Sequence, residues 1–326
     1  MECSKKKHIL ILIPFTKGGS KMDQTIKNLF LFLSTNKMLI KLAKKFGLRF
    51  GATRFVAGET TDQVVKVIKE LNQKGLDVTL DYLGEFVDKR EEAVQTTELT
   101  IDVIKRIGSL KLSSQVSVKL TALGLDISEE LVLKNMHRIL DAAKENNVFI
   151  TIDMEDYTRC QKTLDIFKIL RLEYDHIGTV LQAYLFRTMS DIEDLNEYTA
   201  CLRLVKGAYK ESVDVAFPEK RDVDENFKKI IEKHLLNGNF TSIATHDERI
   251  IEYTKELVKI HQIPSDQFEF QMLYGIRPER QLELVKEGFK MRVYVPFGTD
   301  WYGYFMRRLA ERPANVAFVL KGIFKK

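Results

Sequence analysis

Six polar or charged side chains interrupt apolar runs that are typical of buried β-strands, each late in its run. They are Lys119, Asp153, Gln182, Arg203, His246 and Gln271. Buried parallel strands usually read as nearly continuous apolar segments, so polar residues at matching places in successive strands indicate a shared site. A buried charge is costly unless it is paired, and we therefore expect Lys119 and Asp153, on neighbouring strands, to be partners.

A second group of chemically capable residues lies near the end of the chain. Arg307 and Arg308 are consecutive in a segment, residues 299–312, that has the composition of a helix. Consecutive helical residues project about 100° apart, so this pair can hold one anion from two sides. The aromatic residues that precede the pair, at positions 301–305, indicate a helix that covers a pocket rather than an exposed basic face. The two groups together predict a site for a small anionic substrate, and they do not name a cofactor.

The elements that must position these residues repeat regularly. Eight β-rich runs occupy residues 78–85, 115–123, 148–154, 179–185, 201–209, 241–246, 268–273 and 291–297. Segments with helical periodicity lie at 91–107, 128–146, 161–176, 221–236, 248–261 and 279–287. Eight units of about 30 residues predict an α/β protein of the (β/α)8 TIM-barrel type, with its active site at the carboxyl ends of the strands. The alternative, an open doubly wound sheet, lacks its usual GxGxxG signature here.

The N-terminal part of the chain is expected to differ from the rest. Residues 23–46 carry apolar side chains at helical spacing and predict an N-terminal helix that packs on the domain. Residues 1–21 are interpreted as a disordered tail or a start-site artefact, because residues 17–21 read like a translated purine-rich ribosome-binding site just before Met22. Residues 22–326 are then expected to form a single barrel domain.

Composition excludes several classes of protein. The net charge of +5 comes with lysines spread over amphipathic segments, which indicates solvated helix faces and not a nucleic-acid surface, although weak attraction to an anionic membrane is compatible with it. Three cysteines without a CxxC pair argue against a disulfide framework or a zinc site and fit a reducing cytoplasm. The first strand is not followed by HxH, which disfavours a metal hydrolase barrel. The apolar runs fall short of the roughly 18 residues that a membrane span needs.

Nine motifs occur in order along the chain: RFVAGET (54–60), DYLGE (81–85), SVKLTALG (117–124), TIDMED (151–156), LQAY (181–184), RLVKGAY (203–209), ATHD (244–247), FEFQMLYG (268–275) and RVYVPFGTDWYGYFMRRLAERP (292–313). With these motifs the sequence resembles a known family, the proline dehydrogenases, and within it the short monofunctional bacterial enzymes. The likeness runs from about residue 23 to residue 326.

The resemblance implies a distorted barrel whose final helix covers the barrel mouth, with FAD bound non-covalently across the strand ends. It implies oxidation of L-proline to Δ1-pyrroline-5-carboxylate by hydride transfer to the flavin, the first step of proline catabolism to glutamate. Electrons would pass on to a membrane quinone from a cytoplasmic enzyme that contacts the inner face of the cell membrane. A separate pyrroline-5-carboxylate dehydrogenase would use the product.

The resemblance also implies roles for individual residues. Arg307 and Arg308, helped by Lys119, would bind the proline carboxylate. Tyr294 and Leu273 would contact the pyrrolidine ring of proline, with Tyr209 nearby. The catalytic pair would be Asp153 and Arg203, with Arg203 beside the reactive nitrogen of the flavin. Flavin-binding positions would be Met154, Gln182, Arg203, Lys206, Gly207, Ala208, Thr245 and His246.

Two alternatives remain at this stage. A barrel lyase or aldolase could use Lys119 as a Schiff-base nucleophile. A non-catalytic proline-binding protein could share the same scaffold, although the full set of polar residues at the strand ends argues against it.

Overall fold

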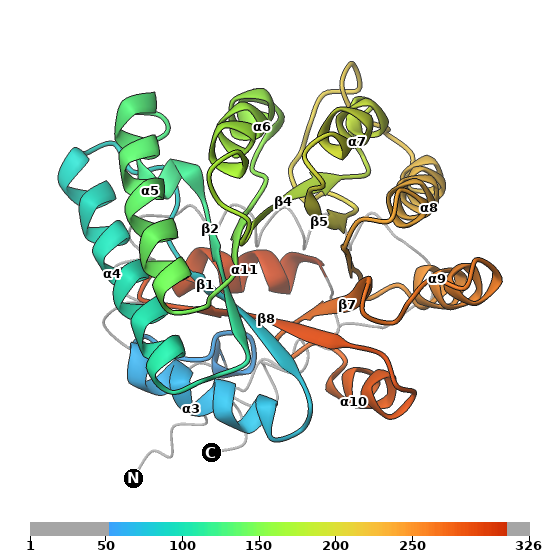
Figure 1. Ribbon diagram of the computed structural model, residues 1–326, viewed down its shortest axis with the longest axis horizontal. Helices are drawn as coiled ribbons and strands as arrows, with labels where there is room; N and C mark the ends of the chain where they lie inside the picture. The colour runs from blue at the N-terminus through green and yellow to red at the C-terminus, as the bar shows by residue number, and fades with distance from the viewer. Residues whose placement is uncertain (1–51, 312–326) are drawn as a thin grey trace, which may run out of the picture.

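The barrel is built from eight parallel strands that alternate with helices (Figure 1). The structure, a computed structural model, describes residues 52–311, with only the backbone given for residues 307–311. The predicted helix at 23–46 and the segment 1–21 lie outside the described residues. The strands are β1 Asp77–Tyr82, β2 Ser114–Val118, β3 Ile150–Ile152, β4 Ile177–Gln182, β5 Cys201–Val205, β6 Thr241–Ala244, β7 Phe268–Leu273 and β8 Met291–Phe297.

The sheet closes through pairing of β1 with β8, so the predicted TIM-type barrel is confirmed. The helices around it are α3 Thr61–Asn72, α4 Arg90–Ser109, α5 Glu129–Glu145, α6 Tyr157–Arg171, α7 Thr188–Asn196, α8 Lys220–Leu236, α9 Glu248–Ile260, α10 Pro278–Lys286 and α11 Trp301–Glu311. Two short 3₁₀ turns, η2 Ala52–Arg54 and η3 Leu120–Leu123, complete the described elements.

The two faces of the sheet differ sharply in polarity. In β5, Leu202 and Leu204 are almost fully buried against the helices, whereas Cys201, Arg203 and Val205 occupy the opposite face and point into the barrel. The other strands follow this alternation, so an apolar layer joins sheet to helices and the interior of the barrel is polar. Inward-facing polar side chains in the other strands include Thr79, Asp81, Gln115, Ser117, Thr151, Gln182, Ser242, Glu269, Gln271, Arg292 and Tyr294.

Most predicted helices are confirmed, one begins earlier than predicted, and two helices of the structure were not predicted. Ser128 caps α5 as expected, its hydroxyl accepting from the Leu131 N–H. Helix α6 begins four residues earlier than predicted, because the Asp156 carboxylate caps it by accepting from the Arg159 N–H. Helices α3 and α7 were not predicted: α7 is short, and α3 precedes the first strand, outside the repeating unit on which the prediction relied.

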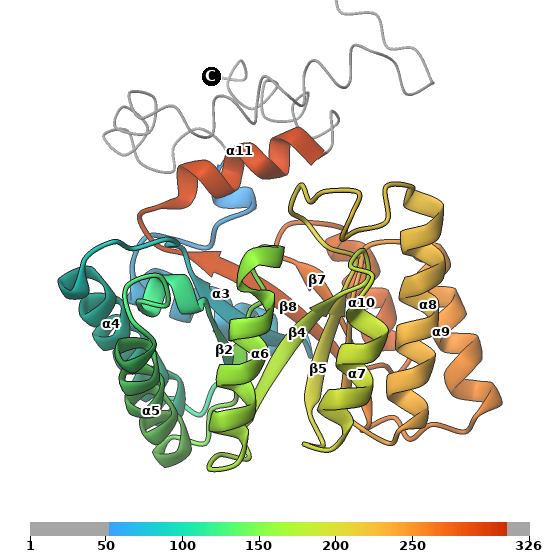
Figure 2. The ribbon, with the colours of Figure 1, turned by 90° about the horizontal axis from the view of Figure 1, so that it is seen from above.

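Helix α11 lies across one end of the barrel, the end toward which the connection from β5 to α8 also rises (Figure 2). That connection leaves the carboxyl end of β5, so α11 covers the carboxyl ends of the strands, as predicted for the final helix. Trp301, Tyr302 and Phe305 of α11 pack with Phe55 and Val56 in a small apolar cluster separate from the main core. The indole Nε1–H of Trp301 also donates to the Glu59 carboxylate at 2.9 Å.

Candidate active site

Asp153 is the centre of the polar network at the carboxyl ends of the strands. It follows β3 directly and is only 9% exposed. Its Oδ1 accepts from Arg203 Nη1 at 2.6 Å and from the Ser117 hydroxyl at 3.0 Å, while its Oδ2 accepts from the Tyr294 hydroxyl at 2.6 Å. Strands β2, β3, β5 and β8 therefore all contribute to one carboxylate, because the closed sheet brings them around the same axis.

Lys119, one residue beyond β2, joins this network. Its ammonium lies 3.7 Å from Asp153 Oδ2, which confirms the predicted partnership. A shorter contact, 2.5 Å, is made with Asp81 Oδ1 in β1. Arg203 completes the group from β5, with its guanidinium 5.2 Å from the centre of the Tyr294 ring. Two cations and two carboxylates thus share a buried space at the barrel mouth.

Opposite charges in this network favour the ionised forms of Asp153 and Lys119, whereas burial raises the pKa of Asp81 above its usual value. Burial alone would raise the pKa of Asp153, but Arg203 and Lys119, together with the Tyr294 hydrogen bond, lower it below the usual value. Burial opposes the charge on Lys119, yet Asp81 and Asp153 raise its pKa above the usual range. Burial, and next the negative charge of Asp153, raise the pKa of Tyr294 well above its ordinary value. Tyr294 therefore remains a protonated donor.

Lys206 lies at the centre of a second ionic cluster, at the end of β5. Its ammonium lies 2.5 Å from Asp224 of α8 and 2.8 Å from Asp247, the residue that caps α9. These two carboxylates hold the lysine at the carboxyl edge of the barrel. Asp247 lies two residues beyond Thr245, whose hydroxyl accepts from the Asp247 N–H at 3.1 Å. The predicted positions Lys206 and Thr245 are therefore linked through a single residue.

His246 and Leu273 are brought together by neighbouring strands. The Leu273 N–H donates to His246 Nε2 at 3.0 Å, so that ring nitrogen carries no proton. Leu273 is the last residue of β7 and also touches the apolar cluster under α11. Leu273, predicted to contact the substrate, and His246, predicted to bind the flavin, are therefore in contact at the barrel mouth.

Gln182 and Met154 lie at the ends of β4 and β3. The Gln182 Nε2–H donates to the Glu155 carbonyl at 3.2 Å, and within the part of the chain that the structure describes its buried Oε1 accepts no hydrogen bond. Met154 is 6% exposed beside the network around Asp153. A buried acceptor without a donor is unfavourable, so Gln182 Oε1 is a candidate contact for a bound group.

The loop after β5 carries Gly207, Ala208 and Tyr209. Gly207 has φ of +111°, and a Cβ there would lie 2.2 Å from the Tyr184 ring, so only glycine fits. Ala208 is exposed and Tyr209 half-buried. Burial raises the pKa of Tyr209, and the negative charges of Glu85 and Glu155 add to the shift.

Three residues of the site were not singled out from the sequence. Asp81 interrupts the apolar run of β1, just as Lys119 follows the apolar run of β2. The search for polar residues in or next to apolar runs could therefore have found Asp81. Ser117 is too common a residue type to give a signal. Glu155 is almost fully buried and accepts from the hydroxyl and the N–H of Thr121, and burial raises its pKa to about 7.

The other predicted site residues are Gln271, Arg307 and Arg308. Gln271 lies in the middle of β7, where its Nε2–H donates to Glu269, and it does not reach the mouth as predicted, because the strand continues two residues beyond it. Arg307 and Arg308 belong to α11, whose backbone covers the mouth, but their side chains lie outside the described residues.

Eight parallel strands, with paired charges gathered at their carboxyl ends under a covering helix, define a TIM-barrel enzyme. A family model described as proline dehydrogenase matches residues 64–321. The chain therefore belongs to the proline dehydrogenase family and is an oxidoreductase.

Relatives of known name agree with this assignment. The chain is 57% identical over 300 residues to "Proline dehydrogenase 2" of Bacillus subtilis (strain 168), covering 92% of this chain and 99% of that one. It is 42% identical over 309 residues to "Proline dehydrogenase" of Deinococcus radiodurans, covering 93% and 99%. Among solved structures, proline utilization A from Bdellovibrio bacteriovorus inactivated by N-propargylglycine superposes with a TM-score of 0.78 at 25% identity, over 94% of this chain and 38% of that longer one.

Proposed function

We propose that the protein is an FAD-dependent enzyme that oxidises L-proline to Δ1-pyrroline-5-carboxylate and passes the electrons to a quinone-type acceptor. The observation that carries the proposal is the convergence of Lys119, Asp153, Arg203 and Tyr294 on one buried point at the barrel mouth, in a chain of this family. The reaction would be the first step of proline catabolism to glutamate.

The residues at the mouth fit a flavin. Gln182 Oε1, which has no donor among residues 52–311, is an acceptor suited to a ring N–H, and Lys206, Thr245 and His246 lie along the same edge of the barrel. We propose that these residues, with Met154, Gly207 and Ala208, hold FAD. Bound FAD would supply the acceptor for the hydride that leaves the proline ring carbon next to the amine.

The charges of the site explain how a carboxylate substrate would be recognised. Lys119 and Arg203 are already matched by Asp81 and Asp153, so the polar network alone adds little positive charge. A bound carboxylate therefore needs further cations, and the Arg307–Arg308 pair on the covering helix is suited to supply them. Lys119, which directly follows β2, would assist this pair.

The remaining residues would orient the reaction. Asp153 fixes the guanidinium of Arg203, which we propose stabilises negative charge that develops on the cofactor side of the site. Tyr294 is held by the same carboxylate and Leu273 by His246, so both can wall the proline ring in fixed positions, with Tyr209 nearby. A lyase reaction through Lys119 is disfavoured, because a lysine kept protonated by two carboxylates is a poor nucleophile.

Partners and location follow from this chemistry as further proposals. Passing electrons to a quinone would require peripheral contact with a membrane, and no helix within residues 52–311 is long and apolar enough to cross one. A separate pyrroline-5-carboxylate dehydrogenase would consume the product. We propose no nucleic-acid partner and a cytoplasmic location on the inner face of the membrane.

The purified protein provides a direct test. We expect a yellow protein with flavin absorbance bands that L-proline bleaches and that turns over with a dye or quinone acceptor. Replacing Arg307 and Arg308 with Met is expected to raise the KM for proline strongly while FAD stays bound. Arg221→Met, on the exposed face of α8, is the matched control and should leave the KM unchanged. A near-normal KM in the double variant would reject the carboxylate role.

A further inference from the structure

Lys119 occupies the N-cap position of the short turn η3. A cap residue normally accepts a hydrogen bond from an N–H of the first turn through a side-chain oxygen, but a lysine side chain carries only donors. The Lys119 ammonium contacts Asp81 and Asp153 instead. The N–H groups at the start of η3 therefore need an acceptor from another part of the chain.

Glu155, in the connection that follows β3, supplies this acceptor. The residue is only 1% exposed. Its Oε2 accepts from the Thr121 N–H at 3.1 Å, and its Oε1 accepts from the Thr121 hydroxyl at 2.5 Å. Thr121 is the second residue of η3 and lies two positions after Lys119. The Glu155 carboxyl therefore fixes the backbone from which the Lys119 side chain extends.

Thr121 also holds the connection that follows β1. Its Oγ1 accepts from the Phe86 N–H at 3.2 Å, and its carbonyl accepts from the Val87 N–H at 3.3 Å. Phe86 has φ of +56°, which is uncommon for a bulky residue and persists only where neighbouring contacts fix the backbone. The contact between Glu155 and Thr121 thus joins the connections that follow β1, β2 and β3.

Glu155 changes its charge near neutral pH. Burial raises the pKa of its carboxyl to about 7, although the two hydrogen bonds from Thr121 and the positive charge of Lys119 oppose this shift. Because an electrostatic interaction is mutual, an ionised Glu155 reduces the positive potential at the Lys119 ammonium. The charged or titratable groups that interact with Glu155 are Lys119 after β2, Glu85 after β1, Arg159 of α6 and Tyr209 after β5.

We infer that Glu155, acting through Thr121, is a positioning residue that holds the Lys119 segment in place for binding the substrate carboxylate, and that this binding is strongest while Glu155 is neutral. The inference rests on the proposed function, in which Lys119 assists the carboxylate site. The Glu155 carbonyl accepts from the Gln182 Nε2–H at 3.2 Å, so the backbone at Glu155 stays anchored when its side chain is replaced.

Cyclopentanecarboxylate is the probe for a test of the charge. It has the ring size and the carboxylate of proline, it lacks the amine that oxidation requires, and it remains an anion from pH 6 to 8.5 because carboxyl groups titrate near 4. Isothermal titration calorimetry on the FAD-loaded protein gives its Kd at both pH values. We expect the Kd of the wild type to be about fivefold higher at pH 8.5, as an order of magnitude for one added charge nearby.

Glu155→Gln is the matching neutral variant. Its amide can accept from the Thr121 N–H and donate to the Thr121 hydroxyl oxygen. The Kd of this variant should equal the wild-type value at pH 6 and stay the same at pH 8.5. Other groups that titrate in this range are present in both proteins, so the difference between the two proteins reports on Glu155.

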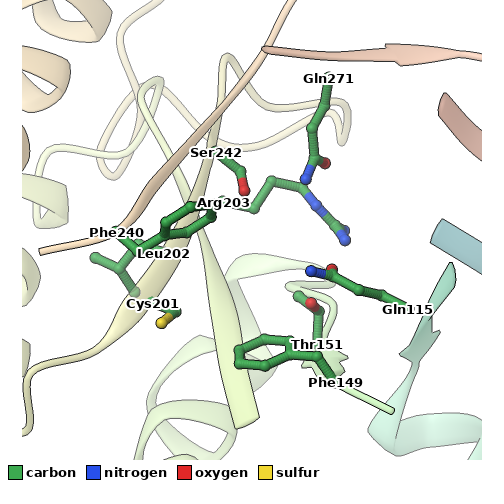
Figure 3. A pocket seen from close by; sticks show the side chains of 9 residues that line it. All are labelled: Gln115, Phe149, Thr151, Cys201, Leu202, Arg203, Phe240, Ser242 and Gln271. Atoms are coloured by element: carbon green, nitrogen blue, oxygen red, sulfur yellow. The ribbon is translucent and has the colours of Figure 1, made fainter. Parts of the chain in front are cut away.

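Thr121 variants test the positioning itself. Thr121→Val removes the hydroxyl contact and should raise the KM for proline about fivefold while kcat stays within about twofold, because the carboxylate is bound equally in the ground state and the transition state. Thr121→Ser keeps the hydroxyl and should restore the wild-type KM. Thr151→Val is the matched control and should leave the KM unchanged, because Thr151 is a buried threonine that lines a separate cavity of about 290 Å³ (Figure 3).

Three results would overturn the positioning role. They are the same dependence of Kd on pH in the wild type and in Glu155→Gln, a Thr121→Val enzyme with lowered kcat and unchanged KM, and a wild type that oxidises proline without binding cyclopentanecarboxylate. The comparison of the wild type with Glu155→Gln decides alone if Thr121→Val does not fold. A wild-type protein that never oxidises proline would instead refute the proposed function.

Discussion

The ion pair between Asp153 and Arg203 offers the strongest quantitative test of the site. Arg203 is 6% exposed, and its Nη1 donates to Asp153 at 2.6 Å. Asp153→Ala would leave this guanidinium buried without its carboxylate and would also remove the acceptor of the Tyr294 hydroxyl. Removing one partner of a buried pair typically costs about 3–5 kcal/mol, and we expect a loss of that size in the free energy of unfolding.

A second variant removes the guanidinium of the pair instead of the carboxylate. Arg203→Met should cost less than Asp153→Ala, because Lys119, at 3.7 Å, and Tyr294 still contact the remaining carboxylate. The double variant no longer holds the unpaired guanidinium. Its loss should therefore fall short of the sum of the single losses by about 2 kcal/mol, within the range measured for residues in direct contact.

Urea unfolding followed by circular dichroism would measure all four proteins of this cycle. Asp62→Ala provides the matched control, because Asp62 also pairs with an arginine, Arg106, at 3.0 Å, but the Asp62 side chain is 80% exposed. Exposed pairs contribute about 0–1 kcal/mol, so this change should be small. If the losses for Asp153 and Arg203 simply add, the two side chains are not energetically coupled and our account of the network is wrong.

Three further predictions concern neighbouring residues. The folded Glu155 carboxyl keeps its proton up to about pH 7, whereas an unfolded glutamate loses it near 4.5, so its contribution to stability is present below pH 4.5 and lost as the pH rises through 7. Glu155→Gln should therefore stabilise the protein at pH 8 relative to wild type, with a smaller gain at pH 5, and equal gains in thermal melts would contradict the buried carboxyl. Gly207→Ala should lower stability by more than about 1 kcal/mol and weaken the FAD binding that we propose, because its Cβ meets the Tyr184 ring; unchanged melting and flavin retention would refute this. Borohydride with pyruvate should leave Lys119 unmodified, and a mass increase on its peptide would show a free amine.

The barrel could be predicted because its repeating pattern is dominated by burial. Each strand exposes one face to the helices, and those faces carry the apolar residues that the sequence shows, as Leu202 and Leu204 do in β5. The short helix α7 escaped prediction because it falls inside a connection where nine residues give little periodicity. Helix α3 escaped because it stands before the first repeating unit.

The site was only partly predictable for a different reason. Lys119, Asp153 and Arg203 are charged residues next to or within apolar runs, and this pattern is visible in the sequence alone. Whether a side chain reaches the mouth or the opposite end depends on strand register, and register is a property of the closed sheet. Gln271 pairs with Ala244 and Arg292 and lies below the mouth, which no local pattern reveals.

The attachment of the covering helix has a practical consequence. Trp301 is the single tryptophan of the sequence, and it lies fully buried in α11 within the apolar cluster that also contains Phe55. The tryptophan fluorescence of the protein therefore arises from the covering helix and not from the barrel. A red shift of this emission that precedes the loss of barrel secondary structure would show that the covering helix detaches before the barrel unfolds.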